Sequence, residues 1–298
     1  MNNKPLRKRK LNISLIALIL AAAIFLGAWY FYDTRLEAAL PHNYLAVHFI
    51  DVGQGDATLI AAQGQFMLID GGERGNERRV INYLRSAGVE RLDIVVASHP
   101  HSDHIGGLAM GILDAFPVGV VIAPRLSAPH PTRTYEHFLE AVSRAVEQGT
   151  QARYAQPGDV FALGDAQVTI LGPLTEDPRN LNNNSVIVRL DYGYTSAMFT
   201  GDAERRAEAA LAAAYGPALR VCVLKAGHHG SNTSSTDIFL YYTAPQFIVI
   251  SCAAGNRHNH PDPRAMERIR ATGATIYRTD IERDVVMLSD GVTFWRAD

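Results

Sequence analysis

The chain places three imidazoles and a carboxylate within six consecutive positions, at His99, His101, Asp103 and His104. Imidazole and carboxylate together are typical ligands of Zn²⁺ and related ions in hydrolytic metal sites. His99 and His101 lie two residues apart and can converge on one ion, while Asp103 and His104 are adjacent and can turn toward a second. Solvated loop histidines are rarely this dense, so the H-x-H-x-D-H spacing predicts a metal site.

Three further segments place polar side chains directly after strand-like apolar runs. Asp202 ends one run and opens a helix, so it is either a metal ligand shared by two ions or, taken alone, a helix N-cap. The other two segments carry Lys225, His228, His229 and Ser231, and then Asn256, His258 and His260. Seven of the eleven histidines lie in the three histidine clusters, which random surface placement would not produce.

The elements that would position these residues alternate from Tyr44 onward. Apolar alternation predicts a first strand at 45–49, and an apolar run predicts the strand at 92–97 that precedes the opening cluster. Further strands are expected at 57–61, 66–70, 118–122, 220–225, 247–252, 274–278 and 285–288, hairpins at 160–171 and 185–200, and helices at 80–87, 106–116, 135–146, 203–215, 235–241 and 262–271. This mixed order predicts an α/β domain with two sheets covered by helices on their outer faces.

The N-terminus differs from the rest of the chain. Residues 1–10 carry five basic and no acidic side chains, which leaves 23 basic against 30 acidic residues in the remainder. Residues 11–32 are uncharged and long enough to span a bilayer at ~1.5 Å per residue. They predict a transmembrane signal anchor, with residues 1–10 in the cytoplasm and the body on the extracytoplasmic side of the cell membrane. A signal peptide cleaved near 36–39 is the alternative, and it also exports the domain.

Composition limits the other function classes. The acidic body does not predict a general polyanion binder, because non-specific nucleic-acid affinity comes mainly from phosphate neutralisation. Lys225 is the single lysine after residue 10. Cys222 and Cys252 each lie in an apolar run, and we expect two small buried side chains rather than a disulfide.

Several motifs, taken in order, resemble the metallo-β-lactamase superfamily: H-P-H-S-D-H-I-G-G, an upstream Asp-Gly-Gly, and downstream Gly-Asp and His-His-Gly-Ser. More narrowly, F-I-D-V-G-Q-G-D-A, L-N-N-N-S-V-I-V, F-T-G-D-A-E and L-K-A-G-H-H-G-S resemble the hydrolase domain of ComEC-type competence channel proteins. The resemblance implies a four-layer αββα sandwich over residues 44–298, with two divalent ions, Zn²⁺ or Mn²⁺, at one edge. It also implies a hydrolase domain without the channel portion, on its own membrane anchor.

The resemblance implies roles for the site residues as well. His99 and His101 would bind the first ion and Asp202 would bridge, while the second ion would be bound by Asp103, His104 and one of the pair His228 and His229, with His228 preferred. The supporting carboxylates would be Asp51, Asp56 and Asp70. The catalytic groups would be Asp103, Lys225, His229 and His260, and the substrate contacts would be Asn184, Ser231 and Asn256. The competing interpretations are a solvated lysine at 225 and a loop histidine packed on Pro261 at 260.

One motif departs from the superfamily pattern, which places a further histidine ligand between the first cluster and Asp202. This chain has Asn182-Asn183-Asn184 at that position, and the only histidines in the interval are His130 and His137. The first ion would therefore have fewer protein ligands and be completed by water or substrate. The loss of a nitrogen ligand favours Mn²⁺ there.

The expected function is a metal-dependent phosphodiesterase that acts as a nuclease on DNA, including single-stranded DNA. One alternative is hydrolysis of a cell-envelope phosphodiester or a lactone. The other is a non-catalytic module, tethered at the membrane, that binds DNA. The intact ligand set argues against this last alternative, because a site kept for its shape alone needs no metal ligands.

Overall fold

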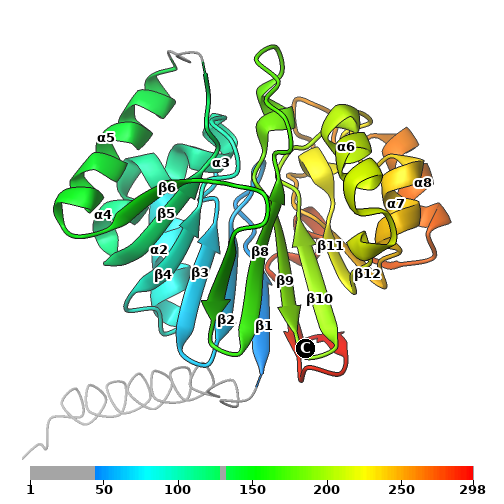
Figure 1. The fold of residues 1–298 in the computed structure, drawn as a ribbon, viewed down its shortest axis with the longest axis horizontal. Coiled ribbons are helices and arrows are strands. Elements are labelled where there is room, and N and C mark those ends of the chain that lie inside the picture. The colour runs from blue at the N-terminus through cyan, green and yellow to red at the C-terminus, as the bar shows by residue number, and fades with distance from the viewer. Residues whose placement is uncertain (1–43, 128–131, 298) are drawn as a thin grey trace, which may run out of the picture. The chain divides into compact units, whose positions relative to one another are not determined.

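Two β-sheets lie face to face in this computed structural model, which describes residues 44–127 and 132–297 (Figure 1). The first sheet runs in the order β15 (Phe294–Arg296), β14 (Val285–Ser289), β1 (Leu45–Phe49), β2 (Thr58–Ala62), β3 (Gln65–Ile69), β4 (Leu92–Val96), β5 (Val118–Ala123) and β6 (Gln151–Tyr154). The second runs in the order β13 (Thr275–Arg278), β12 (Phe247–Ile250), β11 (Val223–Lys225), β10 (Thr195–Phe199), β9 (Ile187–Tyr192), β8 (Ala166–Gly172) and β7 (Val160–Leu163).

Helices cover the outer face of each sheet, as Figure 1 shows. The first sheet carries α2 (Glu77–Ser86), α3 (Ser102–Gly107), α4 (Leu113–Ala115) and α5 (Arg133–Glu147). The second carries α6 (Arg205–Tyr215), α7 (Asp237–Thr243) and α8 (Pro263–Ala271), and a short α9 (Thr279–Glu282) follows β13. The four layers confirm the predicted αββα sandwich.

Strand alternation creates three apolar cores. In β3, Met67 and Ile69 point between the sheets, whereas Leu68 points outward to the helices of the first sheet. Phe49 and Phe199 meet between the sheets with ring centroids 6.1 Å apart. A third core lies between the second sheet and its helices. Because successive side chains of a strand point to opposite faces, a strand buried on both faces contributes to two of these cores at once.

The helix expected at 106–116 is corrected by the structure. The helical segment begins earlier, at Ser102, and is interrupted by a wide turn over Leu108–Ile112 in which Gly111 has a φ of 153°. The first part packs very closely on the loop after β3, since a Cβ at Gly107 would lie 2.0 Å from the carbonyl oxygen of Gly71. This contact requires glycine and fixes Asp103 and His104 in the first turn of α3.

The strand directions bring the predicted clusters to one edge. Strands β3, β4 and β5 are parallel to one another in the first sheet, and β10, β11 and β12 are parallel in the second. The loops after β1, β3 and β4 meet the loops after β10, β11 and β12 at the carboxyl ends of these strands. Ligands and active sites of parallel sheets usually lie at this end.

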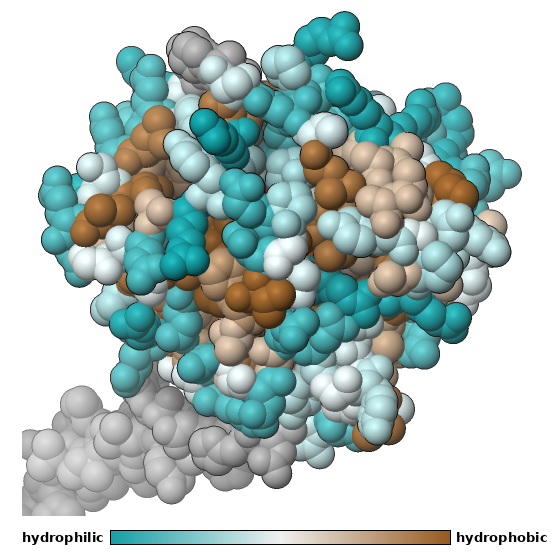
Figure 2. Space-filling view, in the orientation of Figure 1, coloured by the Kyte–Doolittle hydropathy of each residue, from teal (hydrophilic) through white to brown (hydrophobic). Residues whose placement is uncertain are grey.

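Among residues 44–127 and 132–297, no helix is both long enough and apolar enough to cross a membrane. The predicted anchor at residues 11–32, the basic segment 1–10 and His130 lie outside the described residues. Figure 2 shows a largely hydrophilic face on which apolar patches are separated by polar residues. Cys222 and Cys252 are both free; Cys252 is buried as predicted, whereas Cys222 is only half-buried.

Candidate metal centre

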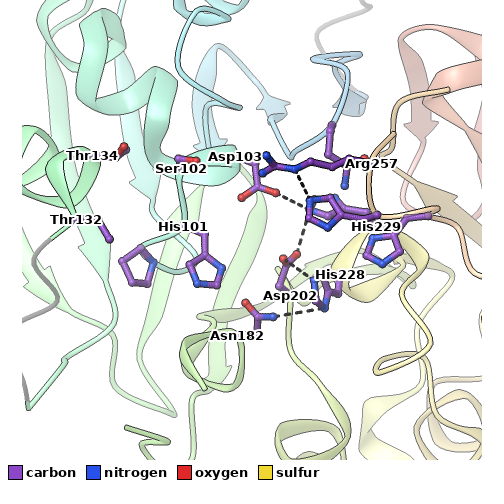
Figure 3. Close-up of a pocket in the computed structure, with 14 residues that line it drawn as sticks. His101, Ser102, Asp103, Thr132, Thr134, Asn182, Asp202, His228, His229 and Arg257 are labelled. Carbon is purple, nitrogen blue, oxygen red and sulfur yellow. Dashed lines mark hydrogen bonds and ion pairs between the residues drawn. The ribbon is translucent and has the colours of Figure 1, made fainter. Parts of the chain in front are cut away.

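A pocket of about 430 Å³ lies at the edge where these loops meet. Figure 3 shows His101 and Asp103 on one side of this space and Asp202, His228 and His229 on the other. The pocket wall therefore combines the end of β4 in the first sheet with the ends of β10 and β11 in the second.

Asp202 lies at the centre of the cluster and is almost fully buried. Its Oδ1 is 3.2 Å from Nε2 of His104 and 3.4 Å from Nε2 of His229. Its Oδ2 is 3.7 Å from Nε2 of His99 and 3.6 Å from Nε2 of His228. Each carboxylate oxygen thus faces two imidazoles, which is the arrangement expected of a ligand shared by two ions.

The first group of donors lies around Oδ1 of Asp202. It consists of Asp56, His104, Asp202 and His229, whose ligand atoms all lie within 4.8 Å of one another. Asp103 joins them through Oδ2, which is 3.3 Å from Nε2 of His229 and 3.9 Å from Nε2 of His104. His229, and not the preferred His228, therefore lies with the residues predicted for the second ion. Asp56, expected as a supporting carboxylate, lies within the donor group itself.

The second group of donors lies around Oδ2 of Asp202. It consists of His99, His101 and Asp202, whose ligand atoms also lie within 4.8 Å of one another. Nε2 of His99 and Nδ1 of His101 are 3.0 Å apart, so both ring nitrogens address the same point. The other nitrogen of His99 contacts the Ser98 hydroxyl at 3.1 Å. These are the residues predicted for the first ion, brought together as expected.

The donor set fits a bound cation. Within the described part of the chain, Nε2 of His104, Nε2 of His229 and Oδ1 of Asp202 are buried without a well-directed hydrogen bond. A buried polar atom left unpaired costs about 1–3 kcal/mol. One cation placed among these atoms would satisfy all three, and the oxygen and imidazole donors suit Zn²⁺ or Mn²⁺.

The pKa values of the histidines shift in opposite directions in the two groups of donors. Burial alone would lower the pKa of His104 and His229, but Asp202 and the neighbouring carboxylates raise it, to about 9 for His229 and well above its ordinary value for His104. The carboxylates thus draw positive charge to the place where the second ion would bind. Around the first ion, burial lowers the pKa of His99 and His101, so both rings are neutral and offer lone pairs.

Asp70 supports the ligands from behind. Its carboxylate accepts hydrogen bonds from the backbone N–H and hydroxyl of Ser98, both at 2.7 Å, and lies 2.8 Å from Nδ1 of His104. A proton on Nδ1 leaves Nε2 of His104 free to bind a metal. This contact is the one that the predicted supporting role requires.

Asp51 lies apart from the donor atoms. It accepts a hydrogen bond from the backbone N–H of Gly53 and is 3.7 Å from Arg79. These contacts stabilise the start of the 51–56 loop and do not reach a predicted metal ligand.

Lys225 does not lie where a substrate-contacting residue would. It is 2% exposed, and its ammonium is 2.5 Å from Oδ2 of Asp56, behind the donor groups and outside the pocket wall. The angle is poor for a hydrogen bond, so the contact is chiefly ionic. Burial raises the pKa of Asp56, but Lys225 and His229 outweigh it and bring the pKa to about 2. We therefore replace the catalytic expectation for Lys225 with a charge-balancing role.

The three predicted substrate contacts also have structural partners. Asn184 is fully buried, where its amide exchanges hydrogen bonds with the backbone of Asp177 at 2.6 and 2.9 Å. The Ser231 hydroxyl lies 3.0 Å from that of Thr233, and Asn256 accepts hydrogen bonds from the backbone of the loop that carries His260. None of the three lines the pocket, whereas His260 does.

Two residues that sequence reasoning did not single out belong to the site. Arg257 lines the pocket beside His258 and His260. Glu204 lies behind His228, with Oε1 3.4 Å from Nδ1 of that ring. Arg257 could have been noted as the cation within the third histidine cluster, and Glu204 as the acid two residues after Asp202.

Comparisons with known proteins bear on the family and the fold of the chain. A profile described as the metallo-beta-lactamase superfamily matches residues 50–253. Competence protein ComA of Neisseria gonorrhoeae is 31% identical over 249 residues, which are 82% of this chain and 32% of that protein. ComE operon protein 3 of Bacillus subtilis is 29% identical over 252 residues, 78% of this chain and 32% of that protein. The chain thus spans about a third of the length of these curated relatives.

Among solved structures, the metallo-beta-lactamase fold protein YhfI from Bacillus subtilis superposes with a TM-score of 0.53 at 12% identity. The match covers 85% of this chain and all of YhfI. At this identity the likeness shows the fold alone.

Proposed function

Because the chain belongs to the metallo-β-lactamase superfamily, we propose that it is a dinuclear metal-dependent phosphodiesterase that hydrolyses DNA outside the cytoplasm. The observation that carries the proposal is Asp202, whose two carboxylate oxygens each face two imidazoles at the wall of an open pocket. The match to a protein named as a competence protein supports DNA as the substrate.

When bound, two divalent ions would supply a nucleophile at neutral pH and neutralise the charge of the phosphate. The residues of this chain would position the substrate. Arg257 presents a guanidinium on the pocket wall, which can bind phosphate oxygens in a bidentate manner. Burial and the neighbouring His228 and His229 lower the pKa of His260 to about 4, so its neutral ring would donate a hydrogen bond to the leaving group.

The test is an assay of the purified protein with single-stranded DNA and with bis-p-nitrophenyl phosphate, in Mn²⁺ or Zn²⁺. We expect turnover that is lost in Asp103→Ala and His104→Ala. The matched control is Asp114→Ala, which removes an exposed carboxylate paired with Arg144 on the helical layer. Turnover that persists in both site variants, or is absent from the wild type with every metal, would refute the proposal.

A second candidate is a small cell-envelope phosphodiester, such as a teichoic-acid phosphocholine, or a lactone. The observation that favours it is the scarcity of cations at the pocket, since Arg257 is the single Lys or Arg on the wall among the described residues. A long polyanion usually meets several basic side chains. Competition between DNA and small diesters in one assay distinguishes the candidates, because DNA should inhibit diester cleavage well below millimolar concentration only if it is the substrate.

We further propose that residues 11–32 anchor the protein in the cell membrane with the domain on the extracytoplasmic side. The support is the uncharged run itself and the five basic residues that precede it. The full chain should remain with membranes after carbonate extraction and be digested by protease added to spheroplasts. Recovery in the carbonate-soluble fraction with a new N-terminus near residues 36–39 would instead support the cleaved signal peptide.

A further inference from the structure

We propose that His228 completes the first metal site through Nε2 and replaces the histidine ligand that the asparagine tract lacks. This assignment rests on the proposed two-metal centre and deepens it. His228 belongs to neither group of donors within 4.8 Å of one another, so the argument depends on where its ring points and what holds it there.

His228 and His229 face different oxygens of Asp202. Nε2 of His228 is 3.6 Å from Oδ2, the oxygen that lies 3.7 Å from Nε2 of His99. Nε2 of His229 is instead 3.4 Å from Oδ1. Both residues have left-handed backbones, with φ of 50° and 53°, and their rings are inclined at 72° to each other. The turn therefore sends adjacent histidines to opposite halves of the centre, as Figure 3 shows.

The far nitrogen of His228 has a carboxylate partner. Nδ1 lies 3.4 Å from Oε1 of Glu204, 3.2 Å from the Thr233 hydroxyl and 3.4 Å from Nδ2 of Asn182. A carboxylate beside Nδ1 favours the proton on that nitrogen and leaves a lone pair on Nε2, toward Asp202. Metal-binding histidines usually have such a partner, which fixes the tautomer and the ring orientation.

The asparagine tract holds this carboxylate in place. Nδ2 of Asn180 and Nδ2 of Asn182 each donate a hydrogen bond of 2.9 Å to Glu204, one to each oxygen. The segment that replaces the missing histidine thus holds the carboxylate of Glu204 in place behind His228.

Asn182 also contributes to the pocket directly. Because its amide nitrogen is used by Glu204, its Oδ1 points the other way, and within the described residues this buried oxygen has no hydrogen-bond partner. Figure 3 shows it directed toward the space between His101 and Asp202. The first site would then combine three imidazole nitrogens with carboxylate and amide oxygens, a set that suits Zn²⁺ as well as Mn²⁺.

The test counts metal ions in the full chain, purified in detergent and freed of metal by chelation. Co²⁺ and Mn²⁺ are titrated by calorimetry, and bound ions are counted by mass spectrometry. We expect two ions in the wild type and one in His228→Ala, with the remaining ion at wild-type affinity. His99→Ala combined with His228→Ala should still bind one ion, because both substitutions remove the same site.

Two variants guard against a folding artefact. Glu204→Gln keeps the volume of the side chain but removes the charge, and it should weaken one ion about 10–100-fold while the other is unchanged. His137→Ala, on α5 and outside both donor groups, should bind two ions as the wild type does. If His228→Ala binds two ions at wild-type affinity, His228 is not a ligand of the first ion, and the assignment is overturned. The proposed function is not affected by that result. Fewer than two ions in the wild type overturn the two-metal centre itself.

Discussion

At the scale of single residues, the site depends on side chains that would never touch a metal. Asp70 has a left-handed backbone, with a φ of 60°, and is fully buried behind His104. It joins the end of β3 to the end of β4 by three contacts, two to Ser98 and one to His104. The orientation of His104 is therefore set by a residue 34 positions earlier in the chain.

Asp70→Asn should weaken metal binding about 10–100-fold, because an amide cannot accept hydrogen bonds from all three of these donors. Calorimetric titration with Co²⁺ measures the effect. Asp51→Asn is the matched control, since Asp51 contacts Gly53 and Arg79 but no predicted ligand. Equal affinities in Asp70→Asn and Asp51→Asn would contradict the supporting role of Asp70.

Lys225→Met should destabilise the metal-free protein by about 3 kcal/mol, because it removes the nearest cation from the buried charge of Asp56 and leaves only His229 to balance it. Urea unfolding in EDTA measures the loss. The double variant Lys225→Met with Asp56→Asn removes both charges and should recover much of it. A single variant as stable as the wild type would show that the ion pair does not balance the charge of the centre.

The sequence identified most of the donor residues but not their directions. The spacing of His99, His101 and His104 predicts a metal site, and the structure brings these residues together. The choice between His228 and His229 could not be made, because the direction of each ring follows from a left-handed turn that tertiary contacts impose. Asn184 was predicted to bind substrate, yet it is used inside its own loop.

At the scale of elements, several strands were predicted closely from their apolar runs. The runs at 45–49, 66–70 and 92–97 reappear as β1, β3 and β4 within one residue at each end. Strand β6 was not predicted, since all four of its side chains are exposed and show no apolar alternation. The interruption over Leu108–Ile112 was also missed, because the apolar spacing does not show that Gly111 leaves the helical conformation.

The contact between β1 and α2 should make stability depend on pH. Burial lowers the pKa of His48 to about 4, and its Nδ1 lies 2.9 Å from the Tyr83 hydroxyl. The unfolded chain takes up a proton near pH 6.5, whereas the folded protein does not until about pH 4. Stability contributed by the neutral ring is therefore lost as the pH falls through this window.

Between pH 7.5 and pH 5, the free energy of unfolding of the wild type should fall by about 2 kcal/mol more than that of His48→Phe. The variant keeps an aromatic ring at this position but cannot take up a proton. Urea unfolding at the two pH values measures the difference. Using the difference between two variants removes the contribution of the other titrating groups. Parallel losses in the two proteins would mean that His48 is not buried in its neutral form.

At the scale of the whole molecule, the centre draws its donor residues from both sheets, whose inner faces also share an apolar core. His99, His101 and His104 follow β4 in the first sheet, whereas Asp202 and His229 follow strands of the second. Each bound ion would therefore link the sheets. Ions that bind only the folded state stabilise it by about 2.7 kcal/mol at a free concentration one hundred times Kd.

Removal of metal should thus lower the melting temperature by several degrees, and Mn²⁺ or Zn²⁺ should restore it. Scanning calorimetry of the wild type with EDTA and with excess metal measures the shift. Asp202→Asn, which replaces the shared carboxylate, should lose most of the metal-dependent increase. A melting temperature that does not respond to metal would show that the ions do not link the sheets.

The direction of β1 has a consequence for how substrate reaches the pocket. This strand starts at Leu45 and leads into the loop that carries Asp56, so Tyr44 lies at the opposite end of the sheet from the donor groups. Five residues of strand correspond to about 17 Å. The described chain thus enters the domain on the side away from the pocket. A polymeric substrate of the kind proposed above could approach the mouth of the pocket without passing Tyr44.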